Sequence, residues 1–455
     1  MTDMTPGAPV QSAAAPPGTS AARKLDRSLV EGPIAPAVWK MAWPTVLQNA
    51  IGGLQGIIDH VMVGHYVGFT GNAAIGVSWQ IFLVVIVFIA SLFTGMGVLV
   101  ARFAGANEPE KVNRTVYQAF LTAVVLSLVV LAPLGYVLSP TLLDLVNATP
   151  EVKREALPFL RTMFVFSIGM LLFFMLGGAL RSAGDARTPL RLGILMTVLN
   201  VAFNVILIPG LGPVPAFGTR GAAIGTVSAS LIVSSIGIWL LLSGRLVVHF
   251  PETMSRRPDL AIIRSLFKFG LPAGIQGVAM NIAGVMLLRF IGSLPHSAEA
   301  QAVYAVGYAE LFALITWTSV GLMGAAAAVA GQNLGAGHPE RAIQGVRIAS
   351  RIGISVAAFV GAFFLLVPEQ LLALFGLNDS SVVALGTQLL RYLCVSGFFI
   401  TVALTYTGGL QGTGDTRGPL YITLLSQVLV PLGLCATLQG LGRLDAAGVW
   451  SAIVL

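Results

Sequence analysis

The chain has 455 residues, of which 56% are hydrophobic and only 10% charged, with a formal net charge of +7. Soluble domains carry roughly 25% charged residues, so this composition excludes a soluble globular protein. Uncharged runs such as 81–100 and 119–137 approach the ~20 residues that cross a hydrocarbon core as a helix. Because the basic residues lie in short segments between apolar runs, they indicate membrane topology and not nucleic-acid binding.

The N-terminal segment, residues 1–32, has the composition of a disordered tail. Its first part is rich in Ala, Pro, Thr and Ser and lacks the apolar core of a signal peptide. The tail is therefore expected to remain uncleaved. Basic residues before and at the start of the first apolar run should hold it in the cytoplasm, namely Arg23, Lys24, Arg27 and Lys40.

Apolar runs separated by Gly, Pro and charged clusters predict an all-α membrane protein with twelve transmembrane helices. The first eleven are expected at 36–63, 74–100, 114–138, 157–180, 189–208, 221–243, 265–292, 302–330, 342–367, 383–410 and 419–441. A twelfth begins near Asp445 and reaches Leu455 after about half a span, so the chain is expected to be truncated at its C-terminus. With the tail inside, alternation puts most Lys and Arg residues, Arg181 among them, on the cytoplasmic side, as the positive-inside rule requires.

Two cytoplasmic loops recur at an offset of 230 residues. The motifs GA and PEK at 105–111 return as GA and PER at 335–341, and GDARTPL at 184–190 returns as GDTRGPL at 414–420. Because the offset contains six helices, an even number, the halves should be parallel repeats related by a pseudo-two-fold axis along the membrane normal, with a cleft between them. The predicted parts are an N-terminal lobe at 33–243, a cytoplasmic linker at 244–264 and a C-terminal lobe at 265–455.

Ionisable side chains within membrane helices are costly, and each is a functional candidate. Asp59 in the first helix is the leading candidate for an ion-coupling carboxylate. Asn200 and Asn204 lie one turn apart on one face of the fifth helix, where they could assist it. Glu310 is the clearest acid of the second lobe.

Structural roles are the alternative for both acids. Asp59 could pair with His60 or His65 near the outer end of its helix, and Glu310 could pair with Arg289. If Asp59 does couple ions, loss of water favours its protonated form, whereas a cationic substrate favours its charged form. Proton and substrate could then compete for one site.

Several other side chains could line the cleft or control it. The candidate substrate-binding residues are Gln48, Gln55, Gln80, Gln276, Asn281 and Met280. Amides in membrane helices also join helices to one another, so that role stays open. Pro44 and Pro272 are candidate gating positions because proline can kink a helix, although such kinks also occur in membrane helices without a switching role.

Known catalytic and nucleotide-binding motifs are missing from the sequence. It has no Gly-Lys pair, hence no P-loop for ATP, and neither HExxH nor Gly-x-Ser-x-Gly. Its two cysteines, Cys394 and Cys435, lie in apolar runs. We therefore expect no enzyme activity, cofactor or bound metal.

An ordered set of motifs resembles the multidrug and toxic compound extrusion (MATE) family from about residue 33 onward. The set comprises Pro44 with DHVMVG at 59–64, the paired GA and GD loops, GAA at 221–223 and GQNLGA at 331–336. The resemblance implies two six-helix lobes and export of small organic, cationic compounds in exchange for protons or sodium ions. It further implies a monomer in a bacterial inner (plasma) membrane, with membrane lipid and no nucleic acid as partners.

Departures from the family pattern place the chain closer to its DinF-like branch than to its NorM-like branch. Acids that NorM-like members carry in helices 7 and 10 align near Asn281 and Ile400, where no carboxylate exists. DinF-like coupling is attributed to the N-terminal lobe. Relatives there can carry Asn-x-x-x-Asp in helix 5, where this chain has Asn200 and Asn204, which weakens the case for sodium binding.

The main alternative function is that of a lipid-linked precursor flippase of the same superfamily. Such a protein needs a strongly cationic cleft for a pyrophosphate head group. Here the basic residues gather at cytoplasmic helix ends, which favours a cationic or neutral substrate. A channel or inert scaffold is a further alternative, disfavoured by the duplicated bundle with few buried acids.

Overall fold

The computed structural model describes residues 25–454, which are helical and contain no strand. Nine of the helices described are long and apolar enough to cross a membrane, and a tenth is added if two helices bent by 53° form one span. Of the predicted disordered tail, residues 1–24 lie outside the described range. Its last part differs from the prediction, because Ser28–Glu31 form a short helix, α1, with Leu29 and Val30 buried.

The N-terminal lobe contains six helical segments, of which all but α2 are long and apolar enough to cross a membrane when the bent pair counts as one. Its elements are α2 (Ile34–Tyr66), α3 (Phe69–Gly105), α4 (Pro109–Val125), the π-helix η1 (Leu126–Leu131), α5 (Ala132–Leu145), α6 (Pro150–Val165), α7 (Ser167–Ser182), α8 (Arg187–Leu207) and α9 (Gly218–Leu242). The elements α4, η1 and α5 form one continuous span, whereas α6 and α7 are the bent pair. Each predicted helix of this lobe overlaps one of these segments.

The C-terminal lobe follows with the remaining segments. Its elements are α10 (Leu260–Gly292), α11 (Ser297–Tyr304), η2 (Ala305–Leu311), α12 (Ala313–Gly335), α13 (Pro339–Leu366), α14 (Pro368–Ala373), α15 (Ser380–Thr413), α16 (Arg417–Thr423), η3 (Leu424–Leu429), α17 (Val430–Gly440) and α18 (Ala446–Val454). With contiguous and bent elements counted as one and the short α1 and α14 left aside, residues 25–454 make twelve segments. The prediction of an all-helical, twelve-helix, two-lobed protein is confirmed.

The segment between the lobes packs on the N-terminal lobe. Gln118 of α4 donates to the carbonyl of Arg257 at 2.7 Å and accepts from the amide of Asp259 at 3.1 Å. Asp259 also caps α10 by accepting from two amides of its first turn. This cap explains why α10 begins earlier than the predicted helix at 265–292.

The repeated Gly-Asp loops have a structural role in both lobes. Gly184 and Gly414 follow α7 and α15 with φ of +99° and +101°, the left-handed conformation that ends helices. Asp185 and Asp415 then accept backbone hydrogen bonds from the first turn of α8 and α16. A helix-ending glycine is therefore present at both positions of the repeat.

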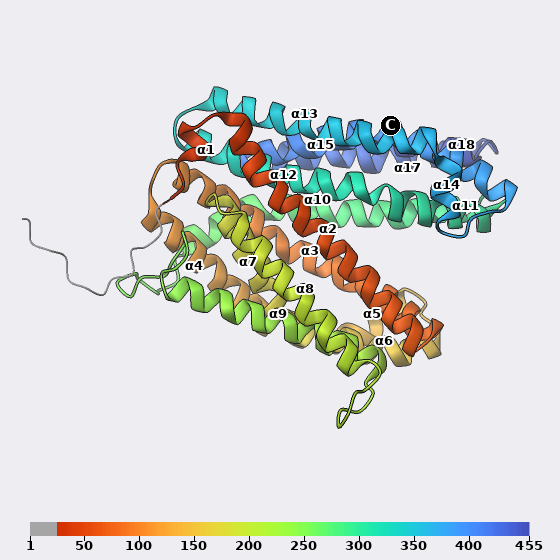
Figure 1. Ribbon diagram of the computed structural model, residues 1–455, viewed down its shortest axis with the longest axis horizontal. Coiled ribbons are helices and arrows are strands. Elements are labelled where there is room, and N and C mark those ends of the chain that lie inside the picture. The colour runs from red at the N-terminus through yellow and green to blue at the C-terminus, as the bar shows by residue number, and fades with distance from the viewer. Residues whose placement is uncertain (1–24, 455) are drawn as a thin grey trace, which may run out of the picture.

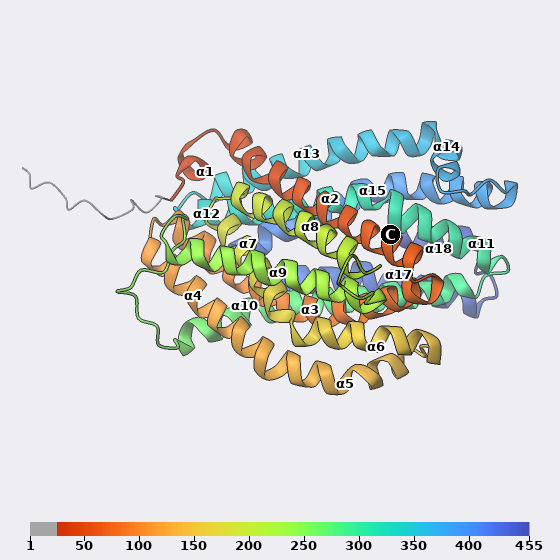
Figure 2. The same cartoon turned by 60° about the horizontal axis from the view of Figure 1, so that its bottom comes forward.

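The lobes meet at the end that carries α1 and α4 and diverge toward α5 and α6 on one side and α11 and α14 on the other (Figure 1). Turning the molecule keeps α1, α4 and α12 at the same end (Figure 2). Between the lobes α2 packs along α12, and α3 along α10. These two pairs are equivalent under the repeat, as a pseudo-two-fold axis requires.

Glycines allow the closest approach between the lobes. A Cβ on Gly105 of α3 would lie 1.9 Å from the carbonyl oxygen of Gln332, and a Cβ on Gly335 of α12 would lie 2.1 Å from that of Arg102. Each residue of the first pair is related by the 230-residue offset to one of the second. The glycines of the repeated GA loops therefore form a reciprocal crossing of α3 and α12.

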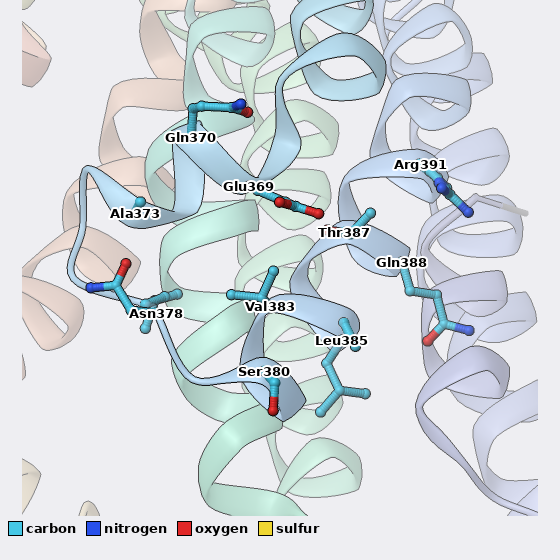
Figure 3. A pocket seen from close by; sticks show the side chains of 12 residues that line it. Glu369, Gln370, Ala373, Asn378, Ser380, Val383, Leu385, Thr387, Gln388 and Arg391 are labelled. Carbon is cyan, nitrogen blue, oxygen red and sulfur yellow. The ribbon is translucent and has the colours of Figure 1, made fainter.

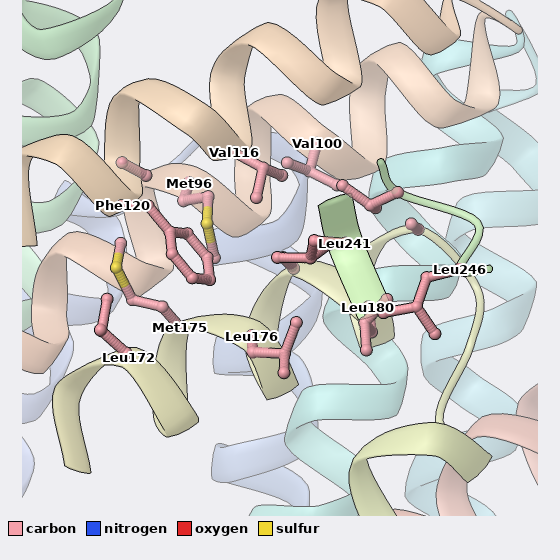
Figure 4. Packing of buried hydrophobic residues seen from close by; sticks show 14 of the residues in the cluster. Met96, Val100, Val116, Phe120, Leu172, Met175, Leu176, Leu180, Leu241 and Leu246 are labelled. Atoms are coloured by element: carbon pink, nitrogen blue, oxygen red, sulfur yellow. The ribbon is translucent and has the colours of Figure 1, made fainter. Parts of the chain in front are cut away.

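Hydrophobic side chains hold the N-terminal lobe together near the end where the two lobes meet, which we call the closed end. Met96, Phe120 and Leu176 meet there from α3, α4 and α7, together with Leu246 of the linker (Figure 4). A separate cluster joins the lobes, because Leu29 of α1 and residues of α2 pack against α12 and α13. The closed end is thus an apolar interface covered by α1.

Candidate functional site

Asp59 lies in α2 within a cluster of amides and a hydroxyl. Nδ2 of Asn204 donates to Oδ1 of Asp59 at 2.6 Å and lies 3.3 Å from Oδ1 of Asn200. Nδ2 of Asn200 donates to the hydroxyl of Thr226 in α9 at 3.0 Å. Both asparagines are fully buried and Asp59 is half-buried. The structure therefore joins three predicted coupling residues and adds Thr226.

The cluster contains an unsatisfied acceptor and an unpaired acid. Oδ1 of Asn204 is buried and has no hydrogen-bond partner among the described residues. Asp59 takes part in no ion pair there, and Nδ1 of His60 lies 2.5 Å from Oδ1 of Asn72 instead. An unpaired carboxyl beside an unsatisfied oxygen suits a proton or another small cation.

Polar contacts continue from this cluster along the contact between α2 and α8. Gln48, Gln55 and Asp59 share one face of α2 because their spacings of seven and four match the helical repeat. Thr197 of α8 donates to Oε1 of Gln55 at 2.9 Å. These contacts form a polar strip along α2 from Gln48 through Gln55 to Asp59, which we call the seam.

Arg181 of α7 lies at the end of this seam that is nearer to α1, the end predicted to face the cytoplasm. Its Nη1 donates to Oε1 of Gln48 at 3.2 Å. A Cβ on Gly177, one turn earlier, would lie 3.1 Å from Nη1, so the side chain runs back along α7 toward the membrane interior. The half-buried Arg181 thus belongs to the bundle, although topology alone indicates only a cytoplasmic cation.

The C-terminal lobe has a neutral counterpart of this contact. Nε2 of Gln411 in α15 donates to Oε1 of Gln276 at 3.1 Å, and Gln276 donates to Thr423 at 2.7 Å. All three side chains are buried. Gln276 therefore joins α10 to α15 and α16, and its predicted role in substrate binding stays a prediction.

Four predicted residues are not joined to either network. Glu310 lies exposed in η2 and forms no ion pair with Arg289 among the described contacts. Gln80 is exposed on α3, and Asn281 donates to the carbonyl of Gly277 on its own helix. Met280 is half-buried. Their predicted roles stay predictions.

The two predicted gating prolines both lie inside long helices. Pro44 is in α2, four residues before Gln48, and Pro272 is in α10, four residues before Gln276. Each proline removes one backbone N–H from the helix. Both helices make contacts between the lobes, so their prolines lie where a bend would change the inter-lobe contact.

A cavity of about 1000 Å³ lies at the diverging end of the C-terminal lobe. Polar side chains line it, among them Glu369 of α14 and Gln388 and Arg391 of α15 (Figure 3). None of the predicted site residues lines this cavity. It is therefore separate from the cluster around Asp59.

Sequence reasoning missed Thr197, Thr226, Arg181 and Gln411 as members of these networks. The repeat carried a signal for two of them, since Arg181 and Gln411 are related by the 230-residue offset. For the threonines no comparable signal exists, because hydroxyls are common in membrane helices.

Comparisons with known proteins agree with this architecture. The MatE family model matches residues 44–206 and 272–437. A probable multidrug resistance protein NorM of Thermotoga maritima is 25% identical, covering 91% of this chain and 88% of that protein. The probable multidrug resistance protein YoeA of Bacillus subtilis is 24% identical over 91% of this chain and 90% of its own.

Solved structures share the fold. One, the outward-facing conformation of a multidrug resistance MATE family transporter of the MOP superfamily, superposes with a TM-score of 0.86 at 22% identity and covers 94% of this chain and 93% of that one. A MOP superfamily transporter from Pyrococcus furiosus, described as having a binding pocket of reverse polarity, gives 0.85 at 22% identity with the same coverage.

Proposed function

The chain belongs to the MatE family, and on this premise we propose that it is a secondary active transporter that exports small organic compounds in exchange for protons or sodium ions. The observation that carries the proposal is the cluster of Asp59, Asn200, Asn204 and Thr226. Relatives named as multidrug resistance proteins support the substrate class. The sequence contains no P-loop, which favours ion exchange over ATP hydrolysis as the driving force.

Asp59 is the residue that couples ion and substrate in this proposal. Its carboxylate has one amide donor, Asn204, and no cationic partner among the described side chains. Binding of a proton or cation therefore neutralises an otherwise unpaired charge. Coupling through the N-terminal lobe matches the DinF-like interpretation of the sequence.

The two-lobed arrangement supports transport by alternating access. The lobes contact each other at the end with α1 and α4 and diverge at the other end, which suits release to the outside. Pro44 and Pro272 lie in the helices between the lobes, and occupancy of Asp59 in α2 would bias the inter-lobe contact. The inner membrane of a bacterium, with the N-terminus in the cytoplasm, is the proposed location.

Transport in everted membrane vesicles tests this function. A fluorescent cationic dye should move against its gradient when a proton or sodium gradient is imposed, and comparing the two ions identifies the coupling ion. Asp59→Asn should abolish movement while the protein still inserts, because the amide cannot exchange a proton. Asp379→Asn is the matched control, since asparagine also caps helices and Asp379 caps α15.

Glu310→Gln, assayed in parallel, tests the second predicted acid. Retained transport would leave coupling to Asp59 alone, whereas loss would place coupling in both lobes. Transport that persists in Asp59→Asn would contradict the assigned role of Asp59. Absence of ion-driven movement of any cationic dye would contradict the transporter itself and favour the flippase.

A further inference from the structure

We propose that Arg181 is an anion-binding residue of the transport pathway, which makes small organic compounds carrying a carboxylate a substrate class of this protein. The inference rests on the proposed transport function and deepens it. Compounds with both charges would place their carboxylate at Arg181 and their cation toward Asp59.

The charge of Arg181 has no partner within the described protein. A guanidinium has five N–H donors, and Arg181 makes one hydrogen bond, to the neutral side chain of Gln48. No ion pair among residues 25–454 includes it. A half-buried cation normally has an anionic partner, because loss of water without compensation is costly. The anionic partner of Arg181 is therefore expected to be a ligand and not a residue of the described chain.

Comparison of the two repeats shows that the hydrogen bond joining the helices does not need a charged donor. Gln411, at the position equivalent to Arg181, donates the same kind of hydrogen bond to Gln276, and both acceptors follow a helical proline by four residues. An amide thus suffices to join the two helices. The guanidinium adds four free donors and a positive charge, which match a carboxylate in geometry and sign.

The surroundings of Arg181 keep its guanidinium directed into the bundle. Gly177 leaves room for the guanidinium one turn before Arg181, and Gly193 of α8 leaves room for Gln48, whose Cγ would lie 3.3 Å from a Cβ there. The charge therefore points along α7 toward the seam and not into the cytoplasm. It lies at the opposite end of the seam from Asp59, so the two ends carry opposite charges.

A pair of dyes that differ in one carboxylate tests the inference. Binding of a rhodamine free acid and of its methyl ester to the purified full-length protein, in phosphatidylcholine nanodiscs, is measured by fluorescence polarisation. Arg181→Gln keeps the hydrogen bond to Gln48 and should weaken binding of the acid by about tenfold or more, while the ester changes by less than about twofold. Arg181→Lys keeps the charge and should lie between.

A second variant covers the case in which Arg181→Gln fails to fold. Gly177→Ala leaves every charge in place but crowds the guanidinium, whose Nη1 would lie 3.1 Å from the added Cβ, and it should also weaken binding of the acid selectively. Equal loss for both dyes, no loss for the acid, or no binding of the acid by the wild type would overturn the inference.

Lipid is the other source of an anion, and a separate arm distinguishes it. If phosphatidylglycerol in the nanodiscs displaces the acid at low mole fraction, a lipid phosphate occupies Arg181 and the substrate class is overturned. The transport assay shows whether the transporter assignment fails together with this inference or survives it. Export of the ester that survives in Arg181→Gln leaves the transporter assignment intact, whatever the acid does.

Discussion

At the scale of single residues, the cluster around Asp59 depends on close packing as much as on hydrogen bonds. Asn204 lies against Gly225 of α9, and a Cβ there would approach Oδ1 of Asn204 to 2.3 Å. Glycine at this position lets α8 and α9 approach closely enough for Asn200 to reach Thr226. The geometry of the proposed coupling site therefore depends on a residue that has no polar side chain.

Gly225→Ala should impair coupling without removing any titratable group. The added methyl group displaces Asn204, so ion-driven transport should fall at least about tenfold, and overpacking should destabilise the protein by about 1–3 kcal/mol. Transport in everted vesicles and the thermal unfolding midpoint measure the two effects. Gly284→Ala, at a position open around its Cα, is the control. Wild-type transport in Gly225→Ala would show that the position of Asn204 does not matter.

At the scale of elements, α1 and the residues beside it connect the two lobes at the end where the lobes meet. Nδ2 of Asn333 donates to the carbonyl of Leu29 at 3.1 Å, and Arg341 of α13 donates to that of Gly32 at 2.7 Å. Asp26, just before α1, pairs with Lys40 of α2. The segment thus contacts both lobes, and Leu29 fills the apolar cluster between them.

The ion pair of Asp26 is present at neutral pH. Burial raises the pKa of Asp26, but hydrogen bonds from Lys40 and Ser28 lower it by more, and the result lies below the ordinary value of 3.8. A carboxylate whose folded pKa is lowered stabilises the fold above its unfolded pKa and loses that contribution as the pH falls through the folded pKa. The contribution of Asp26 is therefore complete above pH ~5 and disappears only in acid.

Arg341→Ala should loosen α1. Leu29→Cys, in a background without Cys394 and Cys435, reports this by its rate of maleimide labelling, because Leu29 is fully buried. Loss of the Arg341 contacts should raise the rate by about tenfold, the equivalent of ~1.4 kcal/mol. The exposed Arg347 of the same helix supplies the control, Arg347→Ala. Equal rates in both variants would mean that α1 is held by its apolar contacts alone.

At the scale of the whole molecule, the reciprocal crossing of α3 and α12 decides how closely the lobes approach at the end with α1 and α4. Gly105 and Gly335 each face a backbone carbonyl of the other lobe, so no side chain can be accommodated without moving a helix. The crossing lies beside α1, and Arg27, the residue just before this helix, donates to the carbonyl of Gly105 at 3.4 Å. Closure of this end therefore depends on two small residues related by the repeat.

Gly105→Val should hold the lobes apart at this end. Spin labels at the exposed positions Glu110 and Glu340, equivalent under the repeat, report the separation by double electron–electron resonance. The distance distribution should shift to longer values, and transport should fall, because the conformation in which the lobes meet at this end is lost. Gly433→Val, at a position with open space, is the control. An unchanged distribution would show that the crossing is not the closing contact.

Much of this architecture was available from the sequence alone. Uninterrupted apolar runs determined the helices, the 230-residue repeat determined the two lobes, and the scarcity of intramembrane acids singled out Asp59. The spacing of Asn200 and Asn204 placed them on one face, because contacts within a helix follow from its period. The helix-ending glycines of the GD loops were likewise predictable, since their conformation is local.

Only the tertiary structure decided which side chains meet across helices. Asp59 bonds Asn204 and not His60, Gln276 bonds Gln411, and Glu310 stays exposed. Arg181 counts as one more cytoplasmic cation in the sequence, yet in the structure its guanidinium turns inward to Gln48. These contacts depend on the crossing angle and separation of helices, which glycines such as Gly225 and Gly105 set. A pattern along one helix does not contain that information.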